Sequence, residues 1–317
     1  MSISESVGTA TAAPAEVVAE ASRPAGRAGG HRAKEGLLAA AFLIPSTVIF
    51  VTFFFLPFFR LFNYGLHRNN SFGTNLRYVG LKQYRQVLTG HDFTEGLLNS
   101  GKYVLFTVPV GLILGTLLAV TANRKLRGIK IFQTIFSSTV ATSVAVASVI
   151  FYVLINPQVG VFRVDWLANP NRSLFHMSAL LAVSLSSMWQ NLGLSFVIVL
   201  AGLQAIPEEV LEAATLDGFG PVRRFFRVTL PLLSPVLMFL VVVLSVFAFQ
   251  AFAQIDILTQ GGPTAGDTET LVFKIFNMQT PGKIGAGSVL AIGLFGVTFV
   301  VTLVQFLILD KRVHYGS

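Results

Sequence analysis

Six long apolar runs constrain this chain more than any other feature. They lie at about residues 37–59, 103–122, 132–155, 177–203, 235–255 and 287–309. None of them contains Asp, Glu, Lys or Arg. A run of roughly 20 apolar residues spans a hydrocarbon layer of about 30 Å as a helix, and one charge at a helix centre costs about 2.5–3.5 kcal/mol. The sequence therefore predicts an all-α polytopic membrane protein with six transmembrane helices.

Composition excludes several classes of protein. The chain has 53% hydrophobic and 12% charged residues over 317 positions, so a water-soluble core could not bury its apolar surface. It contains no Cys, which excludes disulfides and Cys-ligated metals, and its five His are scattered. The net charge of +8 comes from Lys and Arg that flank the apolar runs. They are typical of membrane-surface anchors and do not indicate nucleic-acid binding.

Three segments follow from this pattern. Residues 1–35 are rich in Ala, Ser, Gly and Pro, which predicts a disordered N-terminal tail. Residues 36–310 form the six-helix domain, and residues 311–317 form a short C-terminal tail. The nine-residue connection 123–131 is the densest in Lys and Arg, which favours a cytoplasmic side that also holds both termini.

The runs lack the groups that several membrane machines need. Without an ionisable residue at depth, a proton-coupled carrier and an intramembrane protease are both disfavoured. No Lys is followed by Ser or Thr, so the chain has no ATP-binding phosphate loop. We therefore expect the chain not to be an enzyme and any driven transport to draw energy from another polypeptide. A passive pore or facilitator, or a membrane anchor for other proteins, remains an alternative.

The cytoplasmic connection 204–234 has the clearest local pattern. Pro207 suits the first position of a helix, and Gly218 suits the left-handed residue just past its end. A second short helix is predicted from Pro221, ending at Leu230 and Pro231. The sequence predicts two short surface helices with a hinge at residues 218–220.

This connection resembles the "EAA" signature of ABC-importer permeases. The residues that carry the resemblance are Glu212, Ala213, Ala214, Asp217, Gly218, Leu230 and Pro231. The resemblance implies the type I ABC importer permease architecture, with this loop docked on an ATPase subunit. It implies that Glu212 pairs with a basic group of that subunit, that Ala213 and Ala214 allow close approach, and that Gly218 permits the hinge. The alternative is an amphipathic surface helix whose Glu residues only complement the helix dipole. Phe219 departs from the Ala that carbohydrate-type members often have.

Residues 254–263, ending in Gly-Gly-Pro, are similar to the corresponding segment of carbohydrate- and glycerol-phosphate-type importer permeases. The likeness is greatest to the first permease of glycerol-3-phosphate or glycerophosphodiester importers. The resemblance implies a bacterial plasma (inner) membrane location and four kinds of partner: two ATPase subunits, a second permease expected to be a different chain, an extracytoplasmic solute-binding protein and the lipid bilayer. It implies no cofactor in this chain, because ATP and Mg bind the partner ATPase.

Uncharged polar residues inside the runs, with aromatic residues beside them, are the candidates for a solute path. They are Trp189, Gln190, Asn191, Ser195, Phe247, Gln250 and Gln254. Amides beside an aromatic ring suit the hydroxyls of a polyol or sugar, and Gln250 with Gln254, one turn apart, is the preferred pair. The alternative is that they only hydrogen-bond between helices. A sugar, a polyol phosphate and a glycerophosphodiester all remain candidate solutes, although a bare phosphate would prefer Arg or Lys.

Two further features complete the pattern. Gly111 and Gly115 are expected to allow close helix packing, as are Ser137, Ser138, Thr139, Thr142 and Ser143. The long loop 60–102 could either meet the solute-binding protein or cover the spans as an interfacial helix.

Overall fold

A computed structural model describes residues 28–70, 76–124, 126–155, 174–262 and 268–311. The chain divides into two units, residues 1–57 and residues 58–317, which we describe separately. Most of the predicted tails lie outside the described residues, although helix α1 already begins at Ala28.

The first unit is one long apolar helix. It comprises α1 (Ala28–Phe50), a π-helical turn η1 (Val51–Phe55) and the start of α2 (Leu56–Leu66). Phe42 and Phe53 are 81% and 77% exposed within the chain, as a lipid-facing helix requires. The π-helical turn ends two residues before Pro57, whose missing N–H removes one helical hydrogen bond at this point.

The second unit opens with a small cap of three elements. After α2 the chain forms an antiparallel pair, β1 (His67–Asn69) and β2 (Leu76–Tyr78), and then helix α3 (Leu81–Leu88). The sequence did not predict the two strands. Helix α3 packs against α14 (Ile284–Asp310), and the Tyr84 hydroxyl donates a 3.0 Å hydrogen bond to the Phe62 carbonyl. The long first loop therefore covers the spans with an amphipathic helix.

Helices α4 (His91–Ala122) and α7 (Leu174–Gln204) form the centre of this unit. A Cβ placed on Gly115 would overlap Ser195, and one placed on Gly111 would lie 3.8 Å from the Cβ of Asn191. The prediction of close packing at these two glycines is confirmed. The same contact fixes where Asn191 and Ser195 lie, because it sets the register of α7 on α4.

The third predicted span is not one straight helix. It consists of α5 (Ile129–Ser137), a 3₁₀ turn η2 (Ser138–Ala141) and α6 (Val144–Ile155), with a 104° bend. The side chain of Thr139 packs on Gly193, as expected for a close-packing residue. Ser138 and Ser143 are exposed, so the same expectation is wrong for them.

The next connection contains α8 (Glu208–Leu216), α9 (Pro221–Arg224), a π-helical turn η4 (Phe225–Thr229) and α10 (Leu230–Leu232). The prediction that the second short helix ends at Leu230 and Pro231 is confirmed to within one residue, because the helix from Pro221 ends at Leu232. The missing N–H of Pro231 is accommodated by the π-helical turn before it. The chain then bends by 68° into α11 (Ser234–Phe249).

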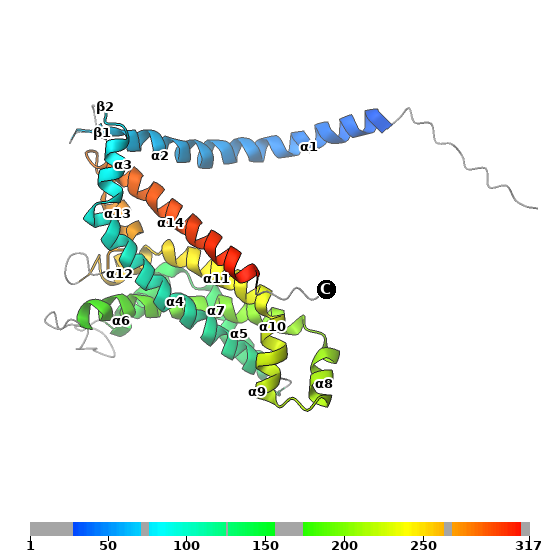
Figure 1. Cartoon of the computed structure of the whole chain (residues 1–317). Helices are drawn as coiled ribbons and strands as arrows, with labels where there is room; N and C mark the ends of the chain where they lie inside the picture. The colour runs from blue at the N-terminus through cyan, green and yellow to red at the C-terminus, as the bar shows by residue number, and fades with distance from the viewer. Residues whose placement is uncertain (1–27, 71–75, 125, 156–173, 263–267, 312–317) are drawn as a thin grey trace, which may run out of the picture. The chain divides into compact units, whose positions relative to one another are not determined.

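The fifth span is shorter than its apolar run. Helix α11 ends at Phe249, and the chain continues through α12 (Ala253–Leu258) and α13 (Leu271–Asn277) to α14. In Figure 1, α12 and α13 lie at the end of this unit opposite α8 and α9. Two apolar clusters along α4, α7 and α11 form its core.

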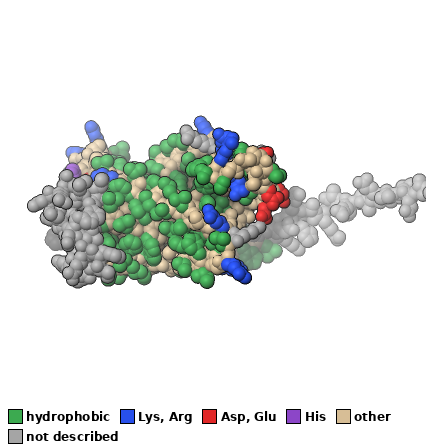
Figure 2. Space-filling model, turned by 90° about the horizontal axis from the view of Figure 1, so that it is seen from below, with side chains coloured by type: hydrophobic (Ala, Val, Ile, Leu, Met, Phe, Trp, Pro, Cys, Tyr) green, Lys and Arg blue, Asp and Glu red, His purple; other side chains and the backbone are tan. Residues whose placement is uncertain are grey.

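Among the described residues, four helices are long and apolar enough to cross a membrane, or up to six if each bent pair counts as one span. The helices extend past the apolar runs, so the first span also contains Arg60 and α4 also contains Asp92, Glu95 and Lys102. Hydrophobic side chains cover the middle of the face in Figure 2, and Asp and Glu gather toward the end that carries α8. This distribution is that of a membrane-embedded surface.

Candidate functional site

The first candidate site is the α8–α9 hairpin, residues 207–224. Helix α8 begins at Glu208, one residue later than predicted, because Pro207 is its N-cap. Gly218 has φ +77°, so it is the left-handed residue that the sequence predicts. The Phe219 N–H donates to the Ala214 carbonyl and the Gly218 N–H to the Thr215 carbonyl, which together form a Schellman motif. The turn is therefore specified by its own residues.

Two side-chain contacts join the arms of this hairpin. Arg224 Nη1 donates a 2.8 Å hydrogen bond to Thr215 Oγ1. The guanidinium of Arg223 lies 4.5 Å from the centre of the Phe219 ring, a cation–π distance. Phe219, the departure from the family pattern, therefore has a role inside the hairpin.

The outer surface of the hairpin is acidic and apolar. Glu212, Ala213 and Asp217 are exposed, and Leu216 is 90% exposed. Glu212 forms no ion pair with any residue that the structure describes. Ala214 is buried within the chain, so of the two alanines expected to allow close approach only Ala213 is exposed. An exposed carboxylate beside a projecting Leu fits a groove with a basic group.

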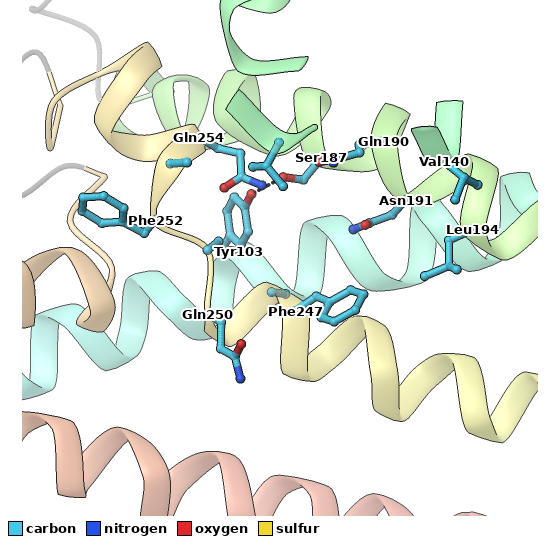
Figure 3. Close-up of a pocket in the computed structure, with 14 residues that line it drawn as sticks. Tyr103, Val140, Ser187, Gln190, Asn191, Leu194, Phe247, Gln250, Phe252 and Gln254 are labelled. Atoms are coloured by element: carbon cyan, nitrogen blue, oxygen red, sulfur yellow. Dashed lines mark hydrogen bonds between the residues drawn. The ribbon is translucent and has the colours of Figure 1, made fainter. Parts of the chain in front are cut away.

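The second candidate site is a cavity of about 570 Å³ beside the middle of α4 and α7 and the C-terminal end of α11. Its polar lining is Tyr103, Ser187, Gln190, Asn191, Gln250 and Gln254. Figure 3 shows Tyr103 and Gln254 pointing toward one another from α4 and α12. No charged side chain lines this cavity among the described residues. It is a neutral site with hydrogen-bonding capacity.

Some of these polar groups form hydrogen bonds within the protein and others do not. The Tyr103 hydroxyl hydrogen-bonds Ser187, and Gln190 Nε2 donates at 3.0 Å to the Thr142 carbonyl at the bend of the third span. The amides of Asn191 and Gln254 form no hydrogen bond with another described residue. Both amides are therefore available to a solute. The sequence prediction missed Tyr103 and Ser187, although Ser187, Asn191 and Leu194 share one helical face.

Gln250 and Gln254 do not share a helical face, contrary to the prediction. Helix α11 ends at Phe249, and Gln254 belongs to the separate helix α12. Gln254 is 8% exposed, whereas Gln250 is exposed and points away from Tyr103 in Figure 3. The non-helical residues 250–252 break the register that the sequence spacing assumed.

Two of the predicted path residues lie outside the cavity. Ser195 is fully buried against Gly115, and its hydroxyl has no hydrogen-bond partner among the described residues. Trp189 faces away and its ring contacts Phe151 at 6.0 Å. Phe247, Gln190 and Asn191 do line the cavity. Asn191 and Ser195 lie on the same face of α7, but close packing against Gly115 removes Ser195 from the cavity.

A polar stripe on α5 leads away from the cavity region. Lys130, Gln133, Thr134, Ser137 and Ser138 line a surface groove of about 530 Å³. Their spacing places them on one helical face. The expectation that Ser137 is a close-packing residue is therefore wrong, because it lines this open groove.

A buried charge cluster, which the sequence did not predict, joins α4 to α13. We call it the α4–α13 joint: Asp92, Glu95, Glu269 and Lys274. Lys274 Nζ lies 2.6 Å from Glu95, 3.2 Å from Glu269 and 3.7 Å from Asp92, and the lysine is 5% exposed. Burial lowers the pKa of Lys274, but hydrogen bonds and attraction from Glu95 and Glu269 outweigh it and raise the pKa above 10.5.

Residues 110–315 match the family described as "Binding-protein-dependent transport system inner membrane component". The chain is 32% identical over 287 residues to the sn-glycerol-3-phosphate transport system permease protein UgpA of Agrobacterium fabrum strain C58, covering 88% of this chain and 97% of that protein. It is 33% identical over 279 residues to UgpA of Yersinia pestis bv. Antiqua strain Antiqua, covering 86% and 94%.

The fold is also similar to a solved structure described as a bacterial alginate ABC transporter in complex with an alginate pentasaccharide-bound periplasmic protein. The TM-score is 0.73 at 20% identity, covering 90% of this chain and 99% of that one. A second structure, of an ABC transporter involved in the import of the acidic polysaccharide alginate, gives a TM-score of 0.69 at 19% identity.

Proposed function

On the premise that the chain belongs to the family of binding-protein-dependent transport system inner membrane components, we propose that this permease subunit moves a small phosphorylated polyol. The first candidate is sn-glycerol-3-phosphate, the solute that names its relatives. Its partners are two ATPase subunits, a second permease and a solute-binding protein. The observation that carries the proposal is an exposed hairpin that directly follows α7, the helix that lines a neutral polar cavity midway along its length.

The α8–α9 hairpin transmits the force. Its exposed Glu212 meets a basic group of the ATPase, and Leu216 enters the adjacent groove. Because Gly218 and the Thr215–Arg224 bond hold the two short helices together, the hairpin moves as one piece. The bend between α10 and α11 then passes this displacement to the helix that borders the cavity.

The cavity holds the polyol hydroxyls. The unused amides of Asn191 and Gln254 each supply two donors and an acceptor, and the exposed Phe247 ring provides an apolar wall. Since the lining contains no cation, this chain binds the hydroxyl part of the solute, and the phosphate is met by the second permease or by the solute-binding protein. Weak binding suits a site that must also release the solute.

The two ends of this unit fix the proposed orientation. The α8–α9 hairpin faces the cytoplasm, where ATP is hydrolysed, and both chain termini lie on that side. The cavity, α12 and α13 face the solute-binding protein. The chain itself hydrolyses nothing and carries no cofactor, because ATP and Mg belong to the ATPase subunits.

Reconstitution of the full complex in proteoliposomes tests the proposal. With sn-glycerol-3-phosphate on the binding protein, Glu212→Ala should lower stimulated ATP hydrolysis and uptake by roughly tenfold or more, since one charge of a docked pair is lost. Glu209→Ala is the matched control, because Glu209 is exposed on the same helix. Equal effects of the two substitutions would contradict the coupling role of Glu212.

The cavity is tested with a pair of amides. Gln254→Leu should reduce uptake and leave the basal ATP hydrolysis unchanged, whereas Gln250→Leu should have a smaller effect because its amide points away from Tyr103 and Gln254. Uptake of a neutral sugar with no uptake of the phosphorylated polyol would overturn the solute assignment. Uptake without ATP would support the passive pore and overturn the whole proposal.

A further inference from the structure

An apolar groove opens where the corner between α3 and α4 meets α14. It has a volume of about 450 Å³ and is lined by Leu88, Phe93, Gly293, Gly296, Val297 and Val300, among others. We call it the α14 groove. Its lining from residue 292 to residue 301 extends about 14 Å along the helix. This surface belongs to a helix long and apolar enough to cross the bilayer.

Two glycines give the groove its shape. A Cβ on Gly293 would lie 2.7 Å from Leu88 and from Phe93, so this glycine lets the corner approach α14 closely. A Cβ on Gly296 would meet no atom within 4 Å, so this glycine leaves the groove open. The groove is therefore a hollow beside a close contact, wide enough for a chain of methylene groups.

Helix α3, whose last residue lines the groove, has the surface of a helix that lies in the membrane interface. The helix is amphipathic, and Leu81 and the neighbouring Tyr78 are 74% and 68% exposed. Exposed aromatic and aliphatic side chains beside polar ones are typical of a helix that lies in the membrane interface. Leu88 at the end of α3 belongs to the groove, one turn after the exposed Arg85.

The surface around this end is rich in basic residues, and the nearby carboxylates Asp92 and Glu95 lie against Lys274. Four exposed cations lie between residues 67 and 90, and this stretch contains no Asp or Glu: they are Arg68, Arg77, Lys82 and Arg85. We call them the basic collar. Arg68 and Arg77 are directly paired across β1 and β2, an arrangement that is unfavourable for like charges. None of the four forms an ion pair with a described carboxylate. An anion bound here would relieve this repulsion.

We propose that the α14 groove binds one acyl chain of an anionic phospholipid whose phosphate lies against the basic collar. The apolar lining accounts for the tail, the collar accounts for the charge of the headgroup, and α3 holds both at the right depth. The lipid belongs to the leaflet at the α3 end of the bilayer. The site is separate from the solute cavity and shares no residue with it.

Photo-crosslinking on the assembled transporter tests this site. The probes are phosphatidylglycerol and phosphatidylethanolamine with identical acyl chains that carry a diazirine near the end. We expect the phosphatidylglycerol probe to label the peptide containing Val297 and Val300 roughly tenfold more than the phosphatidylethanolamine probe. Gly296→Leu should lower this labelling roughly fivefold or more by filling the groove.

Matched variants make the result decisive. Gly101→Leu places the same side chain at another helical glycine with no atom within 4 Å, and it should leave the labelling unchanged. The double substitution Lys82→Gln with Arg85→Gln should remove the preference for phosphatidylglycerol, whereas Lys102→Gln should not. Equal labelling of the Gly296→Leu and unsubstituted proteins, or equal labelling by the two probes, would overturn the proposal. Labelling of other apolar positions but not of this peptide would show that protein covers the groove, and would also overturn it.

Discussion

The α8–α9 hairpin and the α4–α13 joint both connect spans, but they are held together in opposite ways. In the hairpin, the hydrogen bond between the arms joins Thr215 and Arg224, nine residues apart, and Leu216 is 90% exposed. In the joint, hydrogen bonds join residues 170 to 179 positions apart: Asn99 to Glu269, Ser100 to Leu271 and Glu95 to Lys274. A locally specified element can move as a unit, whereas a joint of distant residues fixes two helices to one another.

Removal of the buried cation should have the largest effect on stability. Lys274→Met leaves Asp92, Glu95 and Glu269 close together without their shared partner, and because these carboxylates are partly exposed we expect a loss of about 1.5–3 kcal/mol. The thermal unfolding midpoint of the purified complex measures it. The exposed Lys283 at the start of α14 is the control, since Lys283→Met should have almost no effect. Equal midpoints for the two variants would contradict a structural role of the joint.

Gly218→Val should abolish uptake while the protein stays inserted in the membrane. A Cβ at this position meets no atom within 4 Å, so the cost comes from the left-handed backbone, about 1–2 kcal/mol and more for a β-branched residue. Gly220→Val is the matched control, because Gly220 also has open space but a φ of −63°. Normal uptake by the Gly218 variant would contradict the coupling assignment.

The pH dependence of the joint follows from the raised pKa of Lys274. An ionisable group whose pKa is higher in the folded than in the unfolded protein stabilises the folded protein fully at pH values below the unfolded pKa. This stabilisation is lost as the pH rises through the folded pKa. The stability difference between the unsubstituted protein and Lys274→Met should be constant from about pH 7 to pH 10.5 and then fall by about 1.4 kcal/mol per pH unit until the folded pKa is passed. A difference that disappears between about pH 7 and pH 9 would be inconsistent with this cause.

The smallest effect is expected inside the hairpin. Thr215→Val removes the acceptor of Arg224, and because both side chains are at the surface we expect a loss of about 0.5–1 kcal/mol. The ATP dependence of uptake should be retained. A loss as large as that of Lys274→Met would remove the distinction between the two connections.

The features that the sequence predicted correctly depend on residues close to one another in the sequence. Helix α8, the left-handed Gly218 and the start of α9 at Pro221 depend on residues within one or two turns. The close packing at Gly111 and Gly115 was also predicted, because small residues four positions apart favour helix contact in membranes.

The features that the sequence missed depend on distant partners. Gln250 and Gln254 were placed on one helix because apolar composition continues past Phe249, and composition does not reveal where α11 ends. Ser195 and Asn191 share a face of α7, yet only Asn191 lines the cavity, because Gly115 of α4 packs directly on Ser195. The roles of Tyr103 and Lys274 required knowledge of which helices are neighbours.

The sequence by itself determined that this chain is a six-span membrane protein with a helical hairpin between its fourth and fifth spans. Those properties follow from hydration and local backbone geometry, which act within a few residues of each position. The tertiary structure alone decided which polar groups meet in the cavity, which carboxylates surround Lys274 and where α14 leaves a groove. The physical reason is that in a bilayer the contacts between helices depend on close packing of particular surfaces, and these surfaces are set by partners up to 179 residues away.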